Sequence, residues 1–271
     1  YKPESMEDAV PRTIEGAVLS IADNADSIAG MFALGLVPSG SKDPFALRRQ
    51  ANGIVKIIAE HKLPINLDQL FRDALATYTG SEVAAKSTRG GGDFLNAVIF
   101  FFRERLEFYL RDVLGFAYDV VNAVLAAGAD DVVDVVARAQ AVARVRESED
   151  FAAISAAFKR IKNILRQANE TGKAIAPEFK ADAAADDAER VLAQEVQRVA
   201  PRVRELSQQR KYVDALSEIA TIRPAVDTFF DKVMVMVEDE RVRANRLALL
   251  QSLLNEFSTI ADFSEIVTEK R

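Results

Sequence analysis

Apolar residues recur every three to four positions along most of this chain, and that spacing restricts its fold more than any other feature. One such stripe opens the chain and consists of Ile14, Ala17, Val18, Ile21, Ala25, Ile28 and Ala29. This is the period of an α-helix with one buried face. Alternation of apolar and polar residues, the mark of a strand, does not persist over any useful length. We therefore predict an all-α protein, a helical bundle with two helical subdomains.

Composition narrows the classes of protein to which the chain can belong. With 271 residues, of which 49% are hydrophobic, it can bury the core of one large or two ordinary domains. Its formal net charge of -6 argues against attraction of a polyanion to the whole surface, so any nucleic-acid site has to be a local basic patch. The chain starts at Tyr1 and not at a methionine, so we expect it to be part of a longer polypeptide.

The rarest residue types exclude several kinds of site. Cysteine is absent, which rules out disulfides and thiolate metal ligands and favours a cytoplasmic location. His61 is the one histidine, so these residues cannot build a multi-histidine metal centre, and we expect no metal site. The longest apolar runs, such as Ala97 to Phe102, are far too short to span a membrane. We expect no membrane or secretory segment.

A helix start is expected near residue 43. Asp43 is a good N-cap and Pro44 suits the first helical position, from which a helix would run to about Glu60. The basic residues beside this start are Lys42, Arg48 and Arg49. Because a helix N-terminus next to cations can hold a phosphate, this cluster is a possible phosphate contact. Salt bridges to neighbouring carboxylates are the ordinary alternative.

Asp23 and Asp26 lie three residues apart on the first expected helix. Such a pair could ligate a metal or act as an acid and a base. No histidine or third acid accompanies them, so carboxylates on a helix surface or in a cap are the simpler interpretation.

Two segments of low helix propensity interrupt the pattern. Gly90 to Gly92 lie in a polar stretch and are the best candidate for a domain boundary, which gives domains of residues 1–92 and 93–271. No Lys-Ser or Lys-Thr pair follows these glycines, so they do not match a phosphate-binding loop. The stretch from Thr171 to Asp187 is rich in Ala and Asp, and we expect it to project from the bundle as a loop.

Helices fill nearly all of the expected second domain. The first two should meet near Gly115, a later one should be bent or interrupted near Pro201, and one that opens at Pro224 should continue to Val237. Aromatic residues are concentrated near the start of this domain and comprise Phe100 to Phe102, Phe108, Tyr109 and Phe116. They could form a platform on which bases stack, but their helical spacing favours core packing.

The stretch from Phe158 to Arg166 is the densest basic segment in an acidic chain. Wound as a helix, it separates two faces. The apolar face at core spacing holds Ile154, Phe158, Ile161 and Leu165. The polar face holds Lys159, Lys162, Asn163 and Arg166, with Arg160 at its border. This face is either a solvated surface that keeps a bundle soluble or a surface that meets phosphates, and periodicity alone leaves both open.

Three segments resemble the C-terminal part of the bacterial glycyl-tRNA synthetase β subunit. They read SIADNADSIAGMFALG continuing into PSGSKDPFALRR, then FKRIKNIL, then FFDKVMVMVEDERVRANRLALL. Of these, GSKDPFALRR is the specific one, and the order and spacing of the segments extend the resemblance over essentially all 271 residues.

The resemblance implies a chain in two parts. Residues up to about Gly92 would end an HD-type helical domain, in which Asp23 or Asp26 would take the place of the last metal-binding aspartate. The histidines of a working HD site are absent from the chain, so we expect no hydrolysis. Residues from about Asp93 would form an anticodon-binding helical bundle of the DALR type, shared in outline with arginyl-tRNA synthetases.

The resemblance also implies a function and partners. The complete enzyme joins glycine to its tRNA with ATP and Mg, and the resemblance places that chemistry in a separate α subunit. We therefore expect tRNA(Gly) and the α subunit as partners, in an assembly of two α and two β subunits, with no cofactor and no catalytic residue in this chain. No ATP-binding motif and no nucleophile beside a base is found among its residues.

On this resemblance the basic stretch gains a ligand. Lys159, Lys162 and Arg166 would neutralise phosphates of the anticodon stem or loop, and Asn163 could hydrogen-bond a base edge. A second candidate surface near the last helix comprises Arg241, Arg243 and Arg246. The acids beside these arginines, Glu238 to Glu240, favour local ion pairs instead.

Two other classes of function stay open. The chain could be the remnant of a phosphohydrolase that used Asp23 and Asp26, or a helical scaffold that docks protein partners. Metal titration distinguishes the first from a tRNA-binding domain, and tRNA binding at two salt concentrations distinguishes the second.

Overall fold

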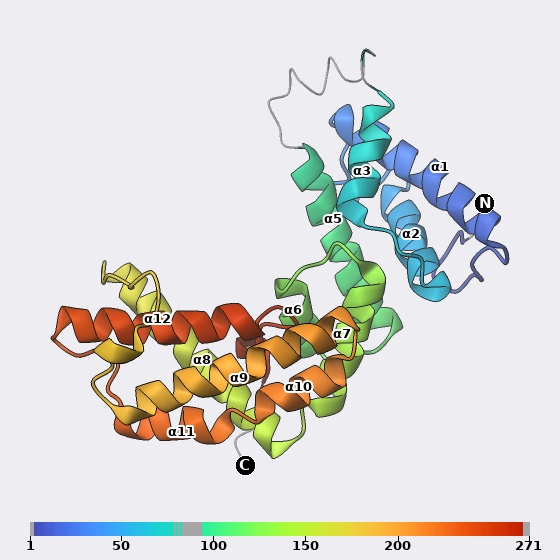
Figure 1. Ribbon diagram of the computed structural model, residues 1–271. Coiled ribbons are helices and arrows are strands. Elements are labelled where there is room, and N and C mark those ends of the chain that lie inside the picture. The colour runs from blue at the N-terminus through green and yellow to red at the C-terminus, as the bar shows by residue number, and fades with distance from the viewer. Residues whose placement is uncertain (1–2, 79, 81, 83–93, 268–271) are drawn as a thin grey trace. The chain divides into compact units, whose positions relative to one another are not determined.

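The computed structural model describes residues 3–78, 80, 82 and 94–267, and the regular elements within these ranges are helices (Figure 1). The two isolated β-bridges in the same ranges join Ser39 to Lys42 and Asn66 to Asp131. The prediction of an all-α fold is thus confirmed. In this described part of the chain, every helix is too short or too polar to cross a bilayer.

The chain forms two compact units, Tyr1–Phe116 with Gly128–Val136, and Ala117–Ala127 with Ala137–Arg271. The division differs from the expected boundary at Gly92, because α5 (Phe94–Phe108) packs against the helices that precede it. Gly90 to Gly92 themselves lie outside the described residues.

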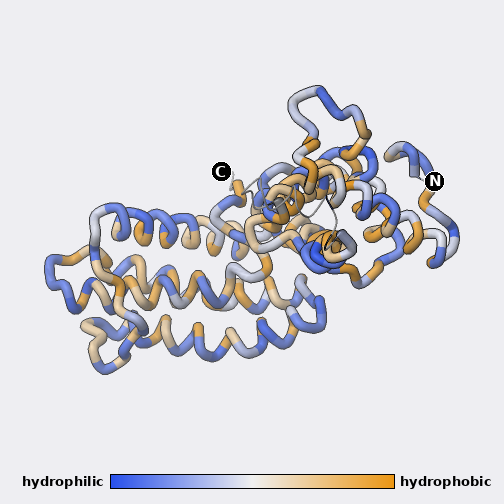
Figure 2. The backbone as a smooth tube through the Cα atoms, turned by 90° about the horizontal axis from the view of Figure 1, so that it is seen from above, coloured by the Kyte–Doolittle hydropathy of each residue, from blue (hydrophilic) through white to orange (hydrophobic). Residues whose placement is uncertain are grey.

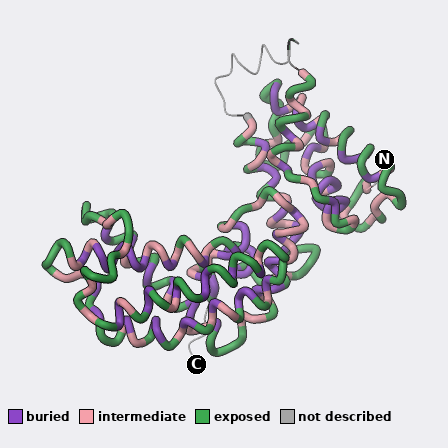
Figure 3. The backbone as a smooth tube through the Cα atoms, in the orientation of Figure 1, coloured by how far each residue is buried: buried purple, intermediate pink, exposed green. Residues whose placement is uncertain are grey.

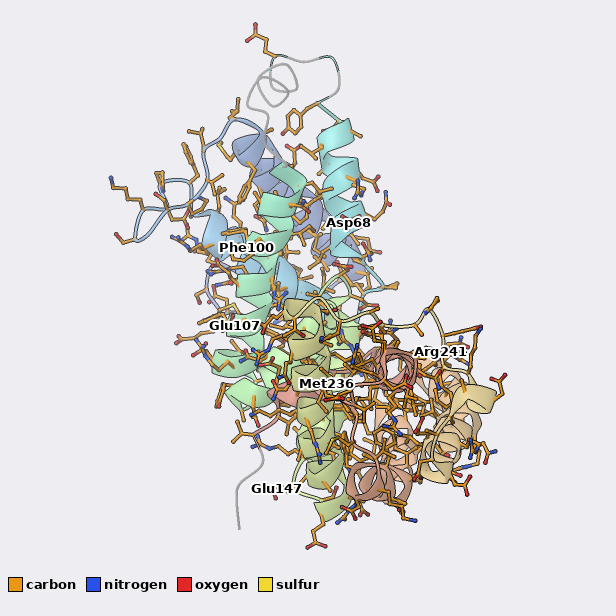
Figure 4. The ribbon with its side chains drawn as sticks, turned by 90° about the vertical axis from the view of Figure 1, so that its left-hand side faces the viewer. Asp68, Phe100, Glu107, Glu147, Met236 and Arg241 are labelled. Atoms are coloured by element: carbon orange, nitrogen blue, oxygen red, sulfur yellow. The ribbon has the colours of Figure 1, made fainter. Side chains whose placement is uncertain are left out.

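The first unit is built around α1 (Ile14–Ala33), which packs against α2 (Leu47–His61), α3 (Leu67–Ala76) and α5. α5 continues into a π-helical turn, Tyr109–Val113. Its aromatic rings close the core: the Phe71 and Phe102 centroids are 4.7 Å apart, and Phe101 lies 5.2 Å from Phe32. Core packing therefore accounts for Phe101, Phe102 and Tyr109 of the aromatic cluster, whereas Phe108 and Phe116 are half-buried and Phe100, labelled in Figure 4, is 65% exposed.

The start of α2 differs from the prediction. The helix begins at Leu47 and not at Pro44, because Asp43 to Ala46 form a turn in which Ala46 takes a left-handed conformation with φ of 56°. Asp43 still caps the helix from outside it. Its two carboxylate oxygens accept hydrogen bonds from the backbone N–H groups of Leu47 at 2.8 Å and Arg48 at 3.0 Å.

The second unit contains α6 (Tyr118–Ala126), α8 (Glu149–Glu170), α9 (Asp187–Gln208), α10 (Tyr212–Ala220), α11 (Arg223–Lys232) and α12 (Glu240–Phe257). The helix α7 (Val132–Val145) begins in the first unit and ends in the second. The central element is α8, which packs against α10, α11, α12 and a short 3-10 turn, Phe263–Glu265. Hydrophobic and hydrophilic positions alternate along the helices in Figure 2, and buried and exposed positions alternate along them in Figure 3.

Two helices in this unit bear on the predictions. Of the two alternatives for Pro201, an interruption is excluded, because α9 continues through this residue; buried neighbours on both sides of it, such as Ala200 and Val203, hold the segment against the bundle. The helix that opens at Pro224 ends at Lys232 and does not reach Val237. The segment Val233 to Val237 is rich in β-branched residues, and its carbonyl groups bond to α12 instead.

The stretch from Thr171 to Asp187 does not project as a free loop. Ala176 donates its backbone N–H to the carbonyl of Ala244 at 3.2 Å. Asn245 accepts from the backbone N–H of Lys180 at 2.8 Å and donates to its carbonyl at 3.0 Å. Backbone polar groups of the segment are thus satisfied on α12.

Candidate nucleic-acid interface

The basic helix α8 separates its two faces as its period predicts. Ser148 caps the helix by accepting from the backbone N–H of Phe151 at 3.3 Å. The apolar face is buried against the bundle and comprises Ile154, Phe158, Ile161 and Leu165. Phe158 packs edge-on against Phe263, with ring centroids 5.1 Å apart. This burial leaves the basic residues of the helix near solvent.

Lys162 is not free to meet a phosphate, which corrects the expectation for this residue. Its Nζ lies 2.5 Å from the carboxylate of Asp262 and 3.6 Å from that of Glu265, and it also donates to Ser264 at 3.1 Å. Burial alone would lower the pKa of Lys162, but the hydrogen bond and charge of Asp262 outweigh it and raise that pKa. A phosphate at this position would have to displace two carboxylates.

Arg160 lies on the opposite border of the same helix and contacts an aromatic ring of the bundle. Its guanidinium group lies over the ring of Phe230 on α11, 4.0 Å from the centroid. This is a cation–π contact, which holds the cation against the bundle while leaving the residue exposed.

Of the predicted residues, three are left exposed between these two borders: Lys159, Asn163 and Arg166, here called the α8 outer face. Arg166 donates to the side-chain oxygen of Asn163 at 3.3 Å and lies 4.0 Å from the carboxylate of Glu170, a weak pair because both side chains are more than two-thirds exposed. Lys159 forms no hydrogen bond or ion pair with any residue in the described ranges. The α8 outer face is therefore the accessible part of the predicted surface.

The arginines of α12 contribute one exposed cation and two buried ones. Arg246 is buried and binds Glu189, itself fully buried, at 2.8 Å, and it donates to the carbonyl of Met234 at 2.8 Å. Arg243 is also buried and donates to the carbonyl groups of Val237 at 2.7 Å and Glu238 at 3.1 Å. These two arginines hold the extended segment before α12 and do not form the surface that we predicted.

Arg241, labelled in Figure 4, is exposed at the start of α12. Asp239 next to it caps the helix by accepting from the backbone N–H groups of Arg241 at 2.9 Å and Val242 at 3.0 Å. The Val242 hydrogen bond is the main reason that the pKa of Asp239 is lowered. Of the three α12 candidates, Arg241 alone has an accessible side chain.

The basic cluster of Lys42, Arg48 and Arg49 lies next to a carboxylate, that of Asp43. Asp43 already occupies the N-terminus of α2, where its carboxylate takes two of the N–H donors that a phosphate would need. Asp43 also lines, with Arg48 and Arg49, a pocket of about 310 Å³. The Asp43 cap therefore disfavours a phosphate at this helix start. The salt bridges expected as the alternative are not seen either, because Lys42, Arg48 and Arg49 form no ion pair with a residue of the described ranges.

Asp23 and Asp26 do not act as a pair. Asp26 accepts a hydrogen bond from the Tyr78 hydroxyl at 2.9 Å, and burial, together with that hydrogen bond and the charge of Asp26, raises the pKa of Tyr78. Asp23 lines a different feature, a pocket of about 220 Å³ that also includes Arg49. Within the described ranges, no group of three or more His, Asp or Glu side chains is placed to hold a metal ion.

One cationic surface was missed by the sequence analysis. A pocket of about 320 Å³ lies between the C-terminal half of α7 and the connection from α9 to α10, and it is lined by Arg144, Arg210 and Lys211. The adjacent pair Arg210 and Lys211 was visible in the sequence, but Arg144 lies more than sixty residues away, and periodicity gives no signal for their meeting.

Comparisons with known proteins agree with this architecture. A family model described as the DALR anticodon binding domain matches residues 154–266, which span α8 to the 3-10 turn. A second model, described as the glycyl-tRNA synthetase beta subunit, matches residues 1–126.

Three similar proteins share the name glycine-tRNA ligase beta subunit. A glycine-tRNA ligase beta subunit from Acidobacterium capsulatum is 55% identical, over 98% of this chain and 37% of its own length. Proteins of the same name from Desulforamulus reducens and Geobacter metallireducens are 41% and 43% identical, over 100% and 98% of this chain. The chain spans little more than a third of the length of these relatives.

The helical bundle from α8 to the 3-10 turn is therefore similar to the DALR anticodon binding domain. Residues 1–126 match the model of the beta subunit, and the relatives align along nearly the whole chain. These two matches show to which synthetase family the chain belongs. The chain belongs to the glycyl-tRNA synthetase beta subunit family.

Proposed function

We propose that this chain is the tRNA-binding, anticodon-recognising part of the beta subunit of a glycine-tRNA ligase. The observation that carries the proposal is the α8 outer face, where Lys159, Asn163 and Arg166 stand exposed on the domain matched to the anticodon-binding family. Within the described ranges, Lys159 has no ion pair to break and Arg166 has only a weak one with Glu170, so both can exchange water for phosphate at little cost.

Each residue of this face has a chemical role in the proposal. Lys159 and Arg166 neutralise phosphates of the anticodon stem or loop, which positions the RNA but carries no sequence information. Asn163 offers both a donor and an acceptor to the edge of an unpaired base. Its weak hydrogen bond with Arg166, at 3.3 Å, is readily exchanged for one to RNA.

The remaining chemistry belongs to other parts of the enzyme. In the proposal, glycine is activated with ATP and Mg in an α subunit, which then transfers it to the tRNA, while this chain binds and orients the tRNA in the cytoplasm. The partners are accordingly tRNA(Gly) and the α subunit, in an assembly of two α and two β subunits.

The test is filter binding of tRNA(Gly) to the complete protein at two salt concentrations. We expect Lys159→Gln with Arg166→Gln to weaken binding and to flatten the dependence of log K on log salt by about 0.7 to 0.9 for each phosphate that is no longer neutralised. The matched control, Arg160→Gln with Lys162→Gln, removes the same charge from the same helix but from residues with other partners.

Two results would count against this function. Equal effects of the two double variants would mean that α8 acts only through its total charge. Binding of the wild-type protein without preference for tRNA(Gly) over another tRNA would favour a helical scaffold instead.

A further inference from the structure

The pocket at the α9–α10 connection is lined by more cations than acids among the described residues. Arg144 from α7 and Arg210 and Lys211 from the connection line it, against one acid among the described lining residues, Asp214. Arg144 and Lys211 are exposed, and neither forms an ion pair with a residue of the described ranges. By contrast, the single cation Lys162 on α8 has two carboxylates within 3.6 Å of its Nζ.

The backbone holds the cations of the connection in fixed positions. The end of α9 is closed by two hydrogen bonds, from the N–H of Lys211 to the carbonyl of Leu206 and from the N–H of Arg210 to that of Ser207, both 2.9 Å. Arg210 stands at φ of 55°, a left-handed position where glycine is usual. The basic pair is therefore presented by a rigid turn and not by a free loop.

The N-terminus of α10 adds to the positive potential of the pocket. Lys211 is the N-cap residue and provides no side-chain acceptor, so the first N–H groups of this nine-residue helix have no capping oxygen from it. Glu205, the nearby acid on α9, is already bonded to Arg202 at 2.7 Å, and that hydrogen bond is the first cause of its lowered pKa, with the charge of Lys211 a minor one.

We propose that this pocket is a second contact site for the RNA backbone, which binds one or two tRNA phosphodiesters through Arg144, Arg210 and Lys211. The proposal rests on the proposed function, because it assigns the same ligand to a second surface of the same unit. In a chain of net charge -6, a local excess of cations is where a polyanion is attracted.

The chemistry favours a phosphodiester in a chain over a free phosphate ion. The cations that line the pocket are exposed, so a single ion would be held against competing water and salt. A nucleic acid releases several counterions when it binds and contacts more than one surface, so it tolerates weak individual contacts.

The experiment compares two double variants of the complete protein in tRNA(Gly) binding across salt concentrations. Arg144→Gln with Lys211→Gln should weaken binding about tenfold at low salt and reduce the salt slope by about 0.7 to 0.9 for each phosphate that is no longer neutralised. The control, Arg72→Gln with Arg111→Gln, removes the same charge from exposed arginines that already pair with carboxylates in the first unit. The control variant should leave the affinity for tRNA(Gly) and the salt slope nearly unchanged. Thermal unfolding verifies that both double variants are folded.

The outcomes separate this inference from the function on which it rests. If the wild-type protein binds tRNA(Gly) with a salt slope and the pocket variant matches it, or if the control weakens equally, the pocket is not a contact site. If the wild-type protein itself shows no such binding, the proposed function and the inference both fail.

A second measurement distinguishes RNA phosphate from a free ion. Inorganic phosphate should displace tRNA no better than chloride at the same ionic strength. Stronger displacement by phosphate that disappears in the pocket variant would replace the backbone contact with a free-phosphate site.

Discussion

Basic residues of similar sequence context have different roles here, and the neighbours of each side chain decide which. Arg241 and Arg246 lie on one helix, yet Arg241 is exposed while Arg246 bonds the buried carboxylate of Glu189. The buried carboxylate is paired and hydrogen-bonded through one oxygen, Oε1, which offsets the cost of burying its charge. Lys159 and Lys162 differ in the same way, since one has no partner in the described ranges and the other has two acids.

The pair of Lys162 and Asp262 should make stability depend on pH. Hydrogen bonds and charge overcome burial to raise the lysine pKa above 10.5 and to lower the aspartate pKa below 3.8. The lowered pKa contributes stability above 3.8 that is lost as the pH falls through the folded value, and the raised pKa contributes stability below 10.5 that is lost as the pH rises through its folded value.

We therefore expect Lys162→Met to lower the free energy of unfolding at pH 7 by at most about 1 kcal/mol, because the lysine is half-exposed. The difference from the wild-type protein should shrink well below pH 3.8, where Asp262 is protonated in both. Urea unfolding at several pH values measures this, with Lys159→Met as the control without a carboxylate partner. A difference that stays constant as Asp262 titrates would show that the pair is not responsible.

Sequence reasoning identified the residues of each face but not their partners. The helical period of α8 correctly placed Ile154, Phe158 and Ile161 in the core, because burial follows spacing within one element. Asp262, which neutralises Lys162, lies one hundred residues further along the chain. No local pattern reports such a contact, and the same holds for the meeting of Arg144 with the α9–α10 connection.

At the scale of single elements, the helices were largely predictable, and their ends were less so. The core spacing found α1, α8 and α12, whereas α11 ended earlier than expected because the carbonyl groups of Met234 and Val237 are taken by arginines of α12. The observed start of α2 also differs from the predicted one because of hydrogen bonds made outside the helix. Asp43 was recognised as a cap, but it reaches the helix across a turn that the sequence did not reveal.

The cap of α2 can be tested by substitution. Asp43→Ala should lower the free energy of unfolding by about 0.5 to 2 kcal/mol, because two backbone N–H groups lose their acceptor. Asp23→Ala is the control, an exposed carboxylate on α1 whose loss should cost less than about 0.5 kcal/mol. Equal unfolding midpoints for the two variants in urea would mean that Asp43 does not act as a cap.

At the scale of the whole molecule, an acidic protein has to attract a polyanion through few cations. The net charge of -6 repels RNA from the surface on average, so recognition depends on surfaces where cations are not matched by acids. Within its described residues, the second unit holds exposed cations without an ion pair at the α8 outer face, where Lys159 lies, and at the pocket of the α9–α10 connection, where Arg144 and Lys211 lie. The two surfaces come from different segments and share no residue, so each can be altered without the other.

If both surfaces contact one tRNA at the same time, the effects of altering them should add. The variant that combines Lys159→Gln and Arg166→Gln with Arg144→Gln and Lys211→Gln should weaken binding by the sum of the two separate changes in binding free energy, within about 0.5 kcal/mol. Its salt slope should fall by the sum of the two separate reductions, because each surface releases its own counterions. Filter binding of tRNA(Gly) to the four proteins of this cycle measures both quantities. A combined variant no weaker than the worse of its parents would mean that a bound tRNA occupies only one of the two surfaces.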